Sequence, residues 1–568
     1  MILKILSLLF ISNISFGAAF QYGGIKHDIT SQTGTASAII MNSASTQVQR
    51  ITGSTAQTLR LPDATTLRSG YWYRVVNENS SAVTIQNSSS FAIGTVSAGT
   101  RDAPTTAQLY LTSSSTSGGP WTVEQSSASS SAASDIYAND KMIYLERGSG
   151  HGSTNTKIRT YSRVLKNTAG STITLTQSAT LGDSFTVNTT GLYGICAGDA
   201  DAGASAVIAI TVNDSALTTS ASTPITYAQG KRGYTNGATS SEPVAICTVQ
   251  PLTDADIVRA HDDGANDSTS TNSYFYIAYL GDSSSYYYLE NGAGYGSTNT
   301  RIRVYTNNRS SSGADISYTS DATNGDSFTI NTDGIYWICR ADKKTDGGMR
   351  GGIAVNDGGA LATEIESLTY ANGKRSIRQS STVGESVNPC AILKLVNTDV
   401  VRAHDSTVRL GNVTDSTSYM EIVKLSGSQS FAYLESGATH GSVATKIRNF
   451  TNLRDSEITD LVSDRSTRQG ASLTAYSPGM YGACYEDYSS GAAATAIAVN
   501  NKAPTTSAST PIEYIEGKRS LANKTTTTES SGVCAFDFLD INDYFSAVDD
   551  GANDGTNEYN SFMGARIN

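Results

Sequence analysis

The stretch that decides the architecture is Tyr144–Arg159, YLERGSGHGSTNTKIR, because the chain repeats it twice more. The second copy, Tyr288–Arg303, reads YLENGAGYGSTNTRIR, and the third, Tyr433–Arg448, reads YLESGATHGSVATKIR. The copies begin at intervals of 144 and 145 residues. This period is far longer than the units of solenoids and propellers, so each copy is expected to be a complete domain.

Two further blocks recur in the same order. The first is GDSFTVNTTGLYGIC from Gly182, GDSFTINTDGIYWIC from Gly325 and GASLTAYSPGMYGAC from Gly470. The second is YAQGKR from Tyr227, YANGKR from Tyr370 and YIEGKR from Tyr514. Blocks that recur in register exclude coincidence and define three equivalent units.

Within each copy, apolar and polar residues alternate in short runs. Phe185 and Val187 alternate with Thr186 and Asn188, and Gly191 then marks a turn. No stretch carries a sustained helical period. The pattern predicts an all-β chain, with a small N-terminal β-sandwich followed by three tandem jelly rolls. The expected segments are a signal peptide (1–19), the small β domain (20–124), a Ser/Ala-rich linker (125–134) and the jelly rolls (135–280, 281–425 and 426–568).

Composition limits the functional classes. Charged residues make up 16% of the chain, and 40 basic against 51 acidic side chains leave a net charge of −11, which argues against binding nucleic acid through a basic face. Lys4, an apolar run and the small residues Gly17, Ala18 and Ala19 have the layout of a secretory signal peptide. We therefore expect export, to the cell surface, to outer-membrane vesicles or to the medium. No membrane span is expected after signal cleavage.

Each copy contains two cysteines, at spacings of 51, 51 and 50 residues. In an exported protein these predict one disulfide per domain, with two buried thiols as the alternative. The predicted pairs are Cys196–Cys247, Cys339–Cys390 and Cys484–Cys534. Cysteine and histidine spacings typical of zinc sites are absent from the sequence.

Two resemblances to known families follow from these blocks. Thr58–Val123, with TLRLPDAT and SAVTIQ, resembles the small β domains of tailed-phage tail fibres. The three copies resemble the jelly roll of the tumour-necrosis-factor and complement-globular-head superfamily, in which an F-x-V-x-x-x-G-x-Y strand pair precedes the middle strands. The matching residues are Phe185, Val187, Gly191 and Tyr193, then Phe328, Ile330, Gly334 and Tyr336, then Leu473, Ala475, Gly479 and Tyr481. The third set departs from the pattern at its first two positions, and the cysteine pairs are no part of it.

This resemblance implies a threefold or pseudo-threefold head on a stalk. A signal peptide on a phage-fibre-like chain is similar to the mosaic adhesive trimers with which predatory bacteria recognise prey. The resemblance implies a non-enzymatic adhesin that recognises cell-surface polymers of another cell, glycans foremost. The alternatives are a tailspike-like polysaccharide depolymerase and a purely structural fibre or virion subunit.

Residues for catalysis are sparse. His151 and His440 align across copies one and three, but copy two has Tyr295 in their place. His261 and His404 align across copies one and two, but copy three has Val548. A catalytic triad needs its histidine in one defined place, so exposed loop histidines are the preferred interpretation.

Calcium is the one cofactor left open. The stretch DDGAND at 262–267 in copy one recurs at 549–554 in copy three and offers oxygen ligands around a Gly turn. Ordinary turn chemistry explains the same residues, and no other cofactor is expected. The candidate calcium ligands are Asp262, Asp263, Asp267, Asp549, Asp550 and Asp554.

Binding chemistry is better represented. Loops rich in Tyr, Ser, Gly and Asn are typical of adaptable recognition surfaces, whereas Tyr193, Tyr336 and Tyr481 are expected in the cores. Lys-Arg pairs recur after Gly and could contact acidic sugars or phosphates or pair across domains, and their repetition favours a structural role. The candidate ligand-binding residues are His151, Tyr286, Tyr287, Tyr295, His440, Lys231, Arg232, Lys374, Arg375, Lys518 and Arg519.

Only five residues link one predicted jelly roll to the next, at 281–285 and 426–430, and five residues span at most about 17 Å. A short tether reaches the base of a neighbouring domain more easily than it climbs a whole domain. We therefore expect the three domains to close into a pseudo-trimer within one chain, with stacked homotrimers as the alternative.

Overall fold

The fold is taken from a computed structural model, which leaves parts of the chain undescribed. The described residues are 29–33, 38–45, 48–67, 71–99, 105–111, 113–126, 140–153, 156–200, 205–215, 225–240, 243–262, 270–282, 284–298, 300–343, 349–380, 385–406, 415–427, 430–441, 446–457, 460–489, 493–501, 517–524, 529–549 and 557–568. The expected signal peptide, at 1–19, and most of the expected linker lie outside them. In the ranges just given, no helix has the length and apolar character that a membrane crossing requires.

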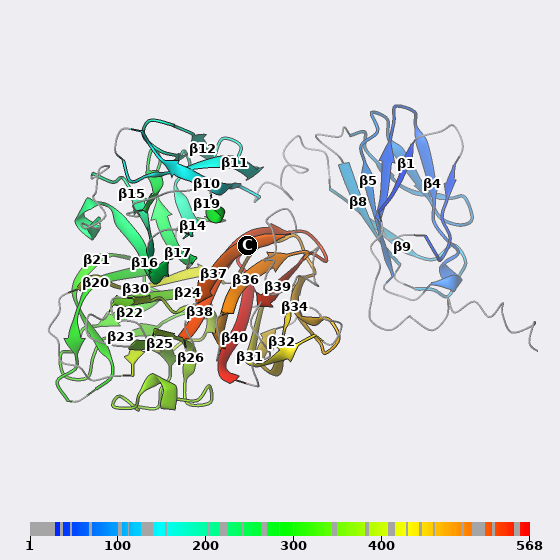
Figure 1. Ribbon diagram of the computed structural model, residues 1–568. Coiled ribbons are helices and arrows are strands. Elements are labelled where there is room, and N and C mark those ends of the chain that lie inside the picture. The colour runs from blue at the N-terminus through cyan, green and yellow to red at the C-terminus, as the bar shows by residue number, and fades with distance from the viewer. Residues whose placement is uncertain are drawn as a thin grey trace, which may run out of the picture. The chain divides into compact units, whose positions relative to one another are not determined.

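The chain divides into two compact units, Met1–Tyr137 and Ala138–Asn568. The first contains two sheets, of order β1-β3-β5-β8-β9 and β2-β4-β6-β7 (Figure 1). Its elements are β1 (Ile29–Thr33), β2 (Ile39–Ile40), β3 (Val48–Thr52), β4 (Gln57–Arg60), the 3-10 helix η2 (Ala64–Thr66), β5 (Trp72–Asn77), β6 (Val83–Gln86), β7 (Ala92–Val96), β8 (Thr105–Leu111) and β9 (Trp121–Ser126).

This unit has the two layers of the expected small sandwich, but its first strands pair differently. Strands β1, β3 and β5 are parallel, and so are β2, β4 and β6, because the chain crosses to the other sheet after each strand. This is the path of a short β-solenoid, which the antiparallel strands β7, β8 and β9 close. The sequence did not distinguish the two forms, since side chains alternate between faces in parallel and antiparallel strands alike.

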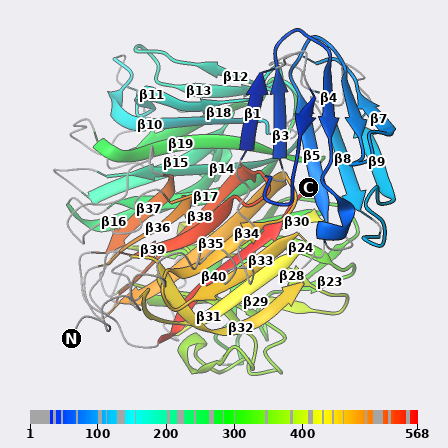
Figure 2. The same cartoon turned by 90° about the vertical axis from the view of Figure 1, so that its right-hand side faces the viewer.

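Repeat 1 of the second unit is a pair of five-stranded sheets. We call β11-β10-β19-β14-β17 its inner sheet and β12-β13-β18-β15-β16 its outer sheet. Figure 2 shows β10, β19 and β14 side by side. The elements are β10 (Met142–His151), β11 (Arg159–Asn167), β12 (Ile173–Thr176), β13 (Ser184–Val187), β14 (Gly191–Asp199), β15 (Ser205–Val212), η3 (Tyr227–Gln229), β16 (Lys231–Ser240), β17 (Val244–Leu252), β18 (Ile257–Asp262) and β19 (Ser270–Gly281).

Repeats 2 and 3 have the same strand order, which is that of a jelly roll, so the predicted fold class is confirmed. Repeat 2 consists of β20 (Tyr286–Tyr295), β21 (Arg303–Ser312), β22 (Ile316–Thr319), β23 (Ser327–Ile330), β24 (Gly334–Lys343), β25 (Met349–Val355), η4 (Ile365–Ser367), β26 (Lys374–Ser380), β27 (Ser386–Val387), β28 (Cys390–Leu395), β29 (Val400–Asp405) and β30 (Asp415–Ser426). Repeat 3 consists of β31 (Phe431–His440), β32 (Arg448–Glu457), β33 (Leu461–Ser466), β34 (Gly470–Ala475), β35 (Gly479–Ser489), β36 (Ala493–Val499), β37 (Lys518–Lys524), β38 (Glu529–Leu539), β39 (Tyr544–Asp549) and β40 (Asn557–Arg566).

The glycine that opens the second sequence block holds a turn against the first block. Gly182 has a φ of 89°, and a Cβ there would lie 2.5 Å from the carbonyl oxygen of Ile158. Gly325 and Gly470 repeat the positive φ and the close approach, to Ile302 and Ile447. Glycine is required because another residue would clash and would be strained in this left-handed conformation. The first and second sequence blocks therefore recur together, because their residues contact each other in every repeat.

The three predicted disulfides are present, each between the Gly-x-Tyr strand and a later strand of the same inner sheet. The paired cysteines face each other in the strand register, as Cys196 and Cys247 do between β14 and β17. Cys339–Cys390 and Cys484–Cys534 are equivalent. Tyr193, Tyr336 and Tyr481 are fully buried, which confirms their expected place in the cores.

Both faces of the inner sheets are buried. On β19, Phe275 and Ile277 point into the core of repeat 1. Tyr274, Tyr276 and Ala278 alternate with them and join a second cluster, to which all three repeats contribute. A strand buried on both faces is a continuous apolar run rather than an alternating one, as the sequence of β19 is.

The repeats close into a ring through one tyrosine each. The hydroxyl of Tyr288 in repeat 2 donates to the carbonyl of Val249 in repeat 1. The hydroxyl of Tyr433 in repeat 3 donates to the carbonyl of Arg375 in repeat 2, at 2.7 Å. Tyr144 of repeat 1 completes the circle by donating to the carbonyl of Arg519 in repeat 3, at 2.6 Å. The expected pseudo-trimer is therefore formed within one chain, with seams that we call 1–2, 2–3 and 3–1.

Side chains at the centre of the ring are complementary rather than identical. Trp337 of repeat 2 packs 5.5 Å from the ring of Phe536 in repeat 3. The residues that match Trp337 are Gly194 and Gly482, and a Cβ on either would lie 2.6 Å from a neighbouring side chain. One tryptophan and two glycines thus share this layer, and the glycines leave room for the larger side chains of the other repeats. The layer therefore favours one copy of each repeat in the ring.

We expect residues 138–568, expressed with their disulfides intact, to be monomeric, because each repeat already has its two neighbours in the same chain. Multi-angle light scattering should give the mass of one chain over a wide concentration range. A mass of three chains would contradict closure within the chain and would support stacked homotrimers.

Candidate functional site

The lysines of the repeated Lys-Arg pairs are internal, which corrects their prediction as ligand-binding residues. Lys231 and Lys374 are fully buried, and Lys518 is 2% exposed. The Lys231 ammonium lies 4.4 Å from the centre of the Tyr227 ring, and Lys374 lies over Tyr370 in the same way. These cation–π contacts stabilise the repeated Tyr…Gly-Lys-Arg block at the start of β16 and β26. The lysines therefore have the structural role that the sequence offered for them.

The predicted ligand groups His151 and His440 lie beside a buried ion cluster. His151 Nε2 is 3.4 Å from Asp262, and His440 Nε2 is 3.7 Å from Asp549. In repeat 2 the matching Tyr295 lies under the Arg303 guanidinium, 5.3 Å from ring centre to guanidinium carbon. The side chains at these three positions contact buried charged groups, so they are less exposed than the sequence predicted.

Asp262 and Asp549, predicted as calcium ligands, belong to that cluster. Arg159 Nη1 lies 3.2 Å from Asp262, and Arg448 Nη1 lies 3.4 Å from Asp549. A carboxylate in contact with a buried guanidinium already has its counter-charge, so these two aspartates are structural. The other calcium candidates, Asp263, Asp267, Asp550 and Asp554, lie outside the described residues, where calcium stays a prediction. Among the residues that are placed, no three metal-ligating side chains come together.

His261 and His404 each pair with an aspartate. His261 Nε2 is 2.6 Å from Asp214 Oδ2, and His404 Nε2 is 2.8 Å from Asp357 Oδ2. Burial alone would raise the pKa of Asp214, but the hydrogen bond and the charges of His261 and Arg259 lower it. Both histidines are buried, contrary to the exposed loop positions that the sequence predicted.

A cavity that brings predicted residues together lies in the 1–2 seam. It has a volume of about 390 Å³, within the range of small-ligand pockets. Arg232 and Tyr286, both predicted, line it, whereas Tyr287 packs against Tyr318 and Phe328 inside repeat 2. The full lining is Thr190, Val212, Asn213, Arg232, Gln250, Pro251, Leu252, Thr253, Asp256, Tyr286, Tyr288, Arg309 and Ser310, and we call it the 1–2 groove.

Two guanidinium groups give the 1–2 groove a positive charge. Arg232 is held by its own backbone, since Nη1 donates to the carbonyl of Lys231 at 2.8 Å. Arg309 lies over the Tyr288 ring, at 4.7 Å, and Nη2 donates to Gln250 at 3.4 Å. Burial and the charge of Arg309 lower the pKa of Arg232 to about 10. Among the described residues, no carboxylate oxygen lies within 4.0 Å of either guanidinium, although the charges of Glu290 and of Asp256, which lines the groove, act on Arg232 from farther away.

In the 3–1 seam, a carboxylate neutralises the arginine that corresponds to Arg232. Arg519 matches Arg232, and its Nε donates to Asp537. Asp537 also accepts from Lys166 Nζ at 3.0 Å, and these charges lower its pKa to about 2 although burial alone would raise it. In the strand register, repeat 1 has Gln250 where repeat 3 has Asp537. The 1–2 groove therefore lacks this carboxylate.

The 2–3 seam is neutralised in another way. Arg454 matches Arg309, and its Nε lies 3.4 Å from Glu435. In repeat 2 the matching Glu290 instead accepts from Asn307. Among the three seams described, the 1–2 groove is thus the one in which neither arginine forms an ion pair within 4.0 Å.

A buried carboxyl lies behind the groove. Glu421 accepts from Trp337 Nε1 at 2.5 Å and from Thr248 Oγ1 at 2.7 Å. Burial raises the pKa of Glu421 to about 7, and these hydrogen bonds only partly oppose the shift. Sequence reasoning missed Glu421, Arg309 and Gln250, because none of them is common to all three repeats and the prediction followed what the repeats share.

No protein-family model and no curated protein matches this sequence. Among solved structures, a crystal structure of murine APRIL at pH 8.5 is 12% identical over 25% of this chain and 98% of its own, with a TM-score of 0.19. Murine APRIL at pH 5.0 is 11% identical over 25% of this chain and 98% of its own, with a TM-score of 0.18. The fold assignment depends on the strand order described above rather than on these likenesses.

We expect Glu421 to make stability fall with rising pH. The folded carboxyl keeps its proton to about pH 7, whereas the unfolded one loses it near pH 4.5, so the unfolding free energy decreases between these values. The difference in unfolding free energy between E421Q and the wild type should therefore shift in favour of E421Q from pH 4.5 to pH 8, by on the order of 3 kcal/mol at most. Denaturant titrations at both pH values measure this change.

D537N is the control. Because the pKa of Asp537 is low, this carboxylate contributes nearly the same amount to the unfolding free energy at both pH values. A difference between E421Q and the wild type that does not change with pH would contradict the shift at Glu421.

Proposed function

We propose that the protein is an exported, non-enzymatic binding protein that recognises acidic polymers on the surface of another cell. The observation that carries this function is the pair of arginines in the 1–2 groove, which form no close ion pair and lie beside the half-buried ring of Tyr286. Three disulfides support an oxidising, extracellular setting.

The chemistry of the 1–2 groove suits an anionic sugar. A guanidinium recognises carboxylate, sulfate or phosphate groups by paired hydrogen bonds. Tyr286 adds an amphipathic ring of the kind that packs against the apolar face of a pyranose. A chain of net charge −11 repels polyanions elsewhere, so local positive charge in one groove would direct them there.

The adhesin resemblance agrees with this function. A rigid, disulfide-linked head that presents one groove suits the receptor-binding end of an adhesive protein. Glycan recognition and the absence of catalytic turnover are both parts of the proposal, and the experiment below separates binding from cleavage.

We expect R309L to weaken binding to an anionic polysaccharide such as polygalacturonate at least tenfold, because it removes one charge-assisted contact. Leucine is the residue of repeat 1 at this position, Leu165, so the fold tolerates it. R454L is the matched control, since Arg454 is already paired with Glu435, and it should bind within twofold of the wild type. Surface plasmon resonance on immobilised polymer gives both affinities.

Binding should also weaken as salt is raised, and a neutral polymer of the same length should bind poorly. Equal loss in R309L and R454L, or equal binding of the neutral polymer, would contradict the proposed function. Gel filtration of the polymer after incubation tests the competing depolymerase function, which predicts shorter chains.

A further inference from the structure

A second cavity lies where the three repeats meet. Matching residues of all three line it: Thr235, Arg378 and Ala522 are equivalent, as are Val244 and Val387 on the neighbouring strands. The cavity therefore lies on the pseudo-threefold axis. The cavity has a volume of about 20 Å³, counted as the space that the centre of a water-sized group can occupy. This is somewhat more than one such group needs.

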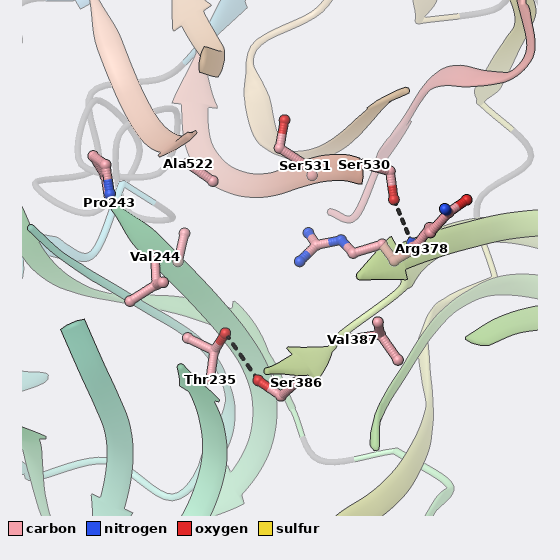
Figure 3. Close-up of a pocket in the computed structure, with 12 residues that line it drawn as sticks. Thr235, Pro243, Val244, Arg378, Ser386, Val387, Ala522, Ser530 and Ser531 are labelled. Carbon is pink, nitrogen blue, oxygen red and sulfur yellow. Dashed lines mark hydrogen bonds between the residues drawn. The ribbon is translucent and has the colours of Figure 1, made fainter. Parts of the chain in front are cut away.

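Arg378 is the one charged side chain among the described residues that line this axial cavity. Figure 3 shows its guanidinium extending between Val244 and Ser531, with Thr235 and Ser386 below. The side chain is 12% exposed, and its Nε is buried without a hydrogen-bond partner. At this position repeats 1 and 3 have Thr235 and Ala522, which carry no charge.

The nearest acid leaves Arg378 incompletely compensated. Glu486 Oε1 lies 3.9 Å from Arg378 Nε, beyond hydrogen-bond distance. The Glu486 oxygens instead accept from Ser376 Oγ at 2.6 Å and from the backbone N–H of Ile377 at 3.0 Å. Burial raises the pKa of Glu486 to about 7, although Arg378 and these hydrogen bonds oppose the shift.

Among the described residues, the other titratable groups that act on Arg378 are uncharged. They are the phenols of Tyr274 and Tyr419, and burial raises the pKa of both. A buried cation whose one ion pair is long and lacks a hydrogen bond is unfavourable, so an added anion would stabilise the protein at this place. Hydroxyl groups of Ser386, Ser530 and Ser531 surround the space and can turn their protons toward an anion.

We infer that the axial cavity binds one small monovalent anion of the halide class, such as chloride, as the counter-charge of Arg378. The anion lies on the axis, in contact with one guanidinium and with hydroxyls of repeats 2 and 3. It stabilises the closed ring, since its ligands come from more than one repeat. This site is separate from the 1–2 groove and does not depend on the proposed function.

Thermal unfolding of the full chain tests this inference, with sodium chloride replaced by sodium gluconate at constant ionic strength. Gluconate is too large for the cavity. Chloride at 200 mM should raise the Tm of the wild type by about 2 °C, as expected for a ligand that binds only the folded state. In R378T, which has the residue of repeat 1, this rise should disappear, and in gluconate the variant should be at least as stable as the wild type. R465T removes an exposed arginine from repeat 3 and should keep the rise.

A crystal of the wild type grown in sodium bromide gives an independent result, which is decisive even if R378T does not fold. We expect an anomalous peak in the axial cavity within about 3.5 Å of the Arg378 guanidinium. A cavity without such a peak would overturn the inference, and so would an equal chloride dependence in R378T and the wild type.

Discussion

The rest of the structure depends on the burial of both faces of each inner sheet. One face closes the jelly roll to which the sheet belongs, and the other has no cover except the neighbouring repeats. A repeat on its own would expose a broad apolar face that includes Tyr274, Tyr276 and Ala278, which a soluble monomer rarely does. Closure into a ring follows from this constraint, and one chain with three repeats satisfies it without a partner.

Joining the three repeats in one chain removes the need for them to be identical. In a homotrimer, every residue near the axis occurs three times, and every seam is the same. Here one tryptophan and two glycines share one layer, and one arginine faces a threonine and an alanine in another. The seams differ in the same way, because Asp537 neutralises one arginine cluster whereas Gln250 leaves its counterpart charged. Covalent linkage thus permits one specialised groove on a threefold scaffold.

The sequence predicted the features that recur and missed those that differ. The repeated blocks and the alternating strands predicted the jelly rolls, the cysteine spacing predicted the disulfides, and the five-residue links predicted closure of the ring. Arg232 and Tyr286 were found because one recurs after a glycine and the other lies in a run of tyrosines. Arg309 and Glu421 gave no such signal, since their importance depends on the absence of a partner across a seam. The lysines were misplaced because charge predicted exposure, whereas the rings of Tyr227 and Tyr370 stabilise them inside. The parallel strands of the first unit were missed because strand direction leaves no mark on the alternation of side chains.

The number of acidic ligands bound by each chain tests the central claim most directly. Isothermal titration of the full chain with a short uronic-acid oligosaccharide, at low salt, measures this number. If the ring closes within one chain and the arginines of the 1–2 seam are the pair without close ion pairs, the titration gives one site per chain, and R309L abolishes it. Three equivalent sites per chain would contradict the account, because they would show that the three seams bind alike.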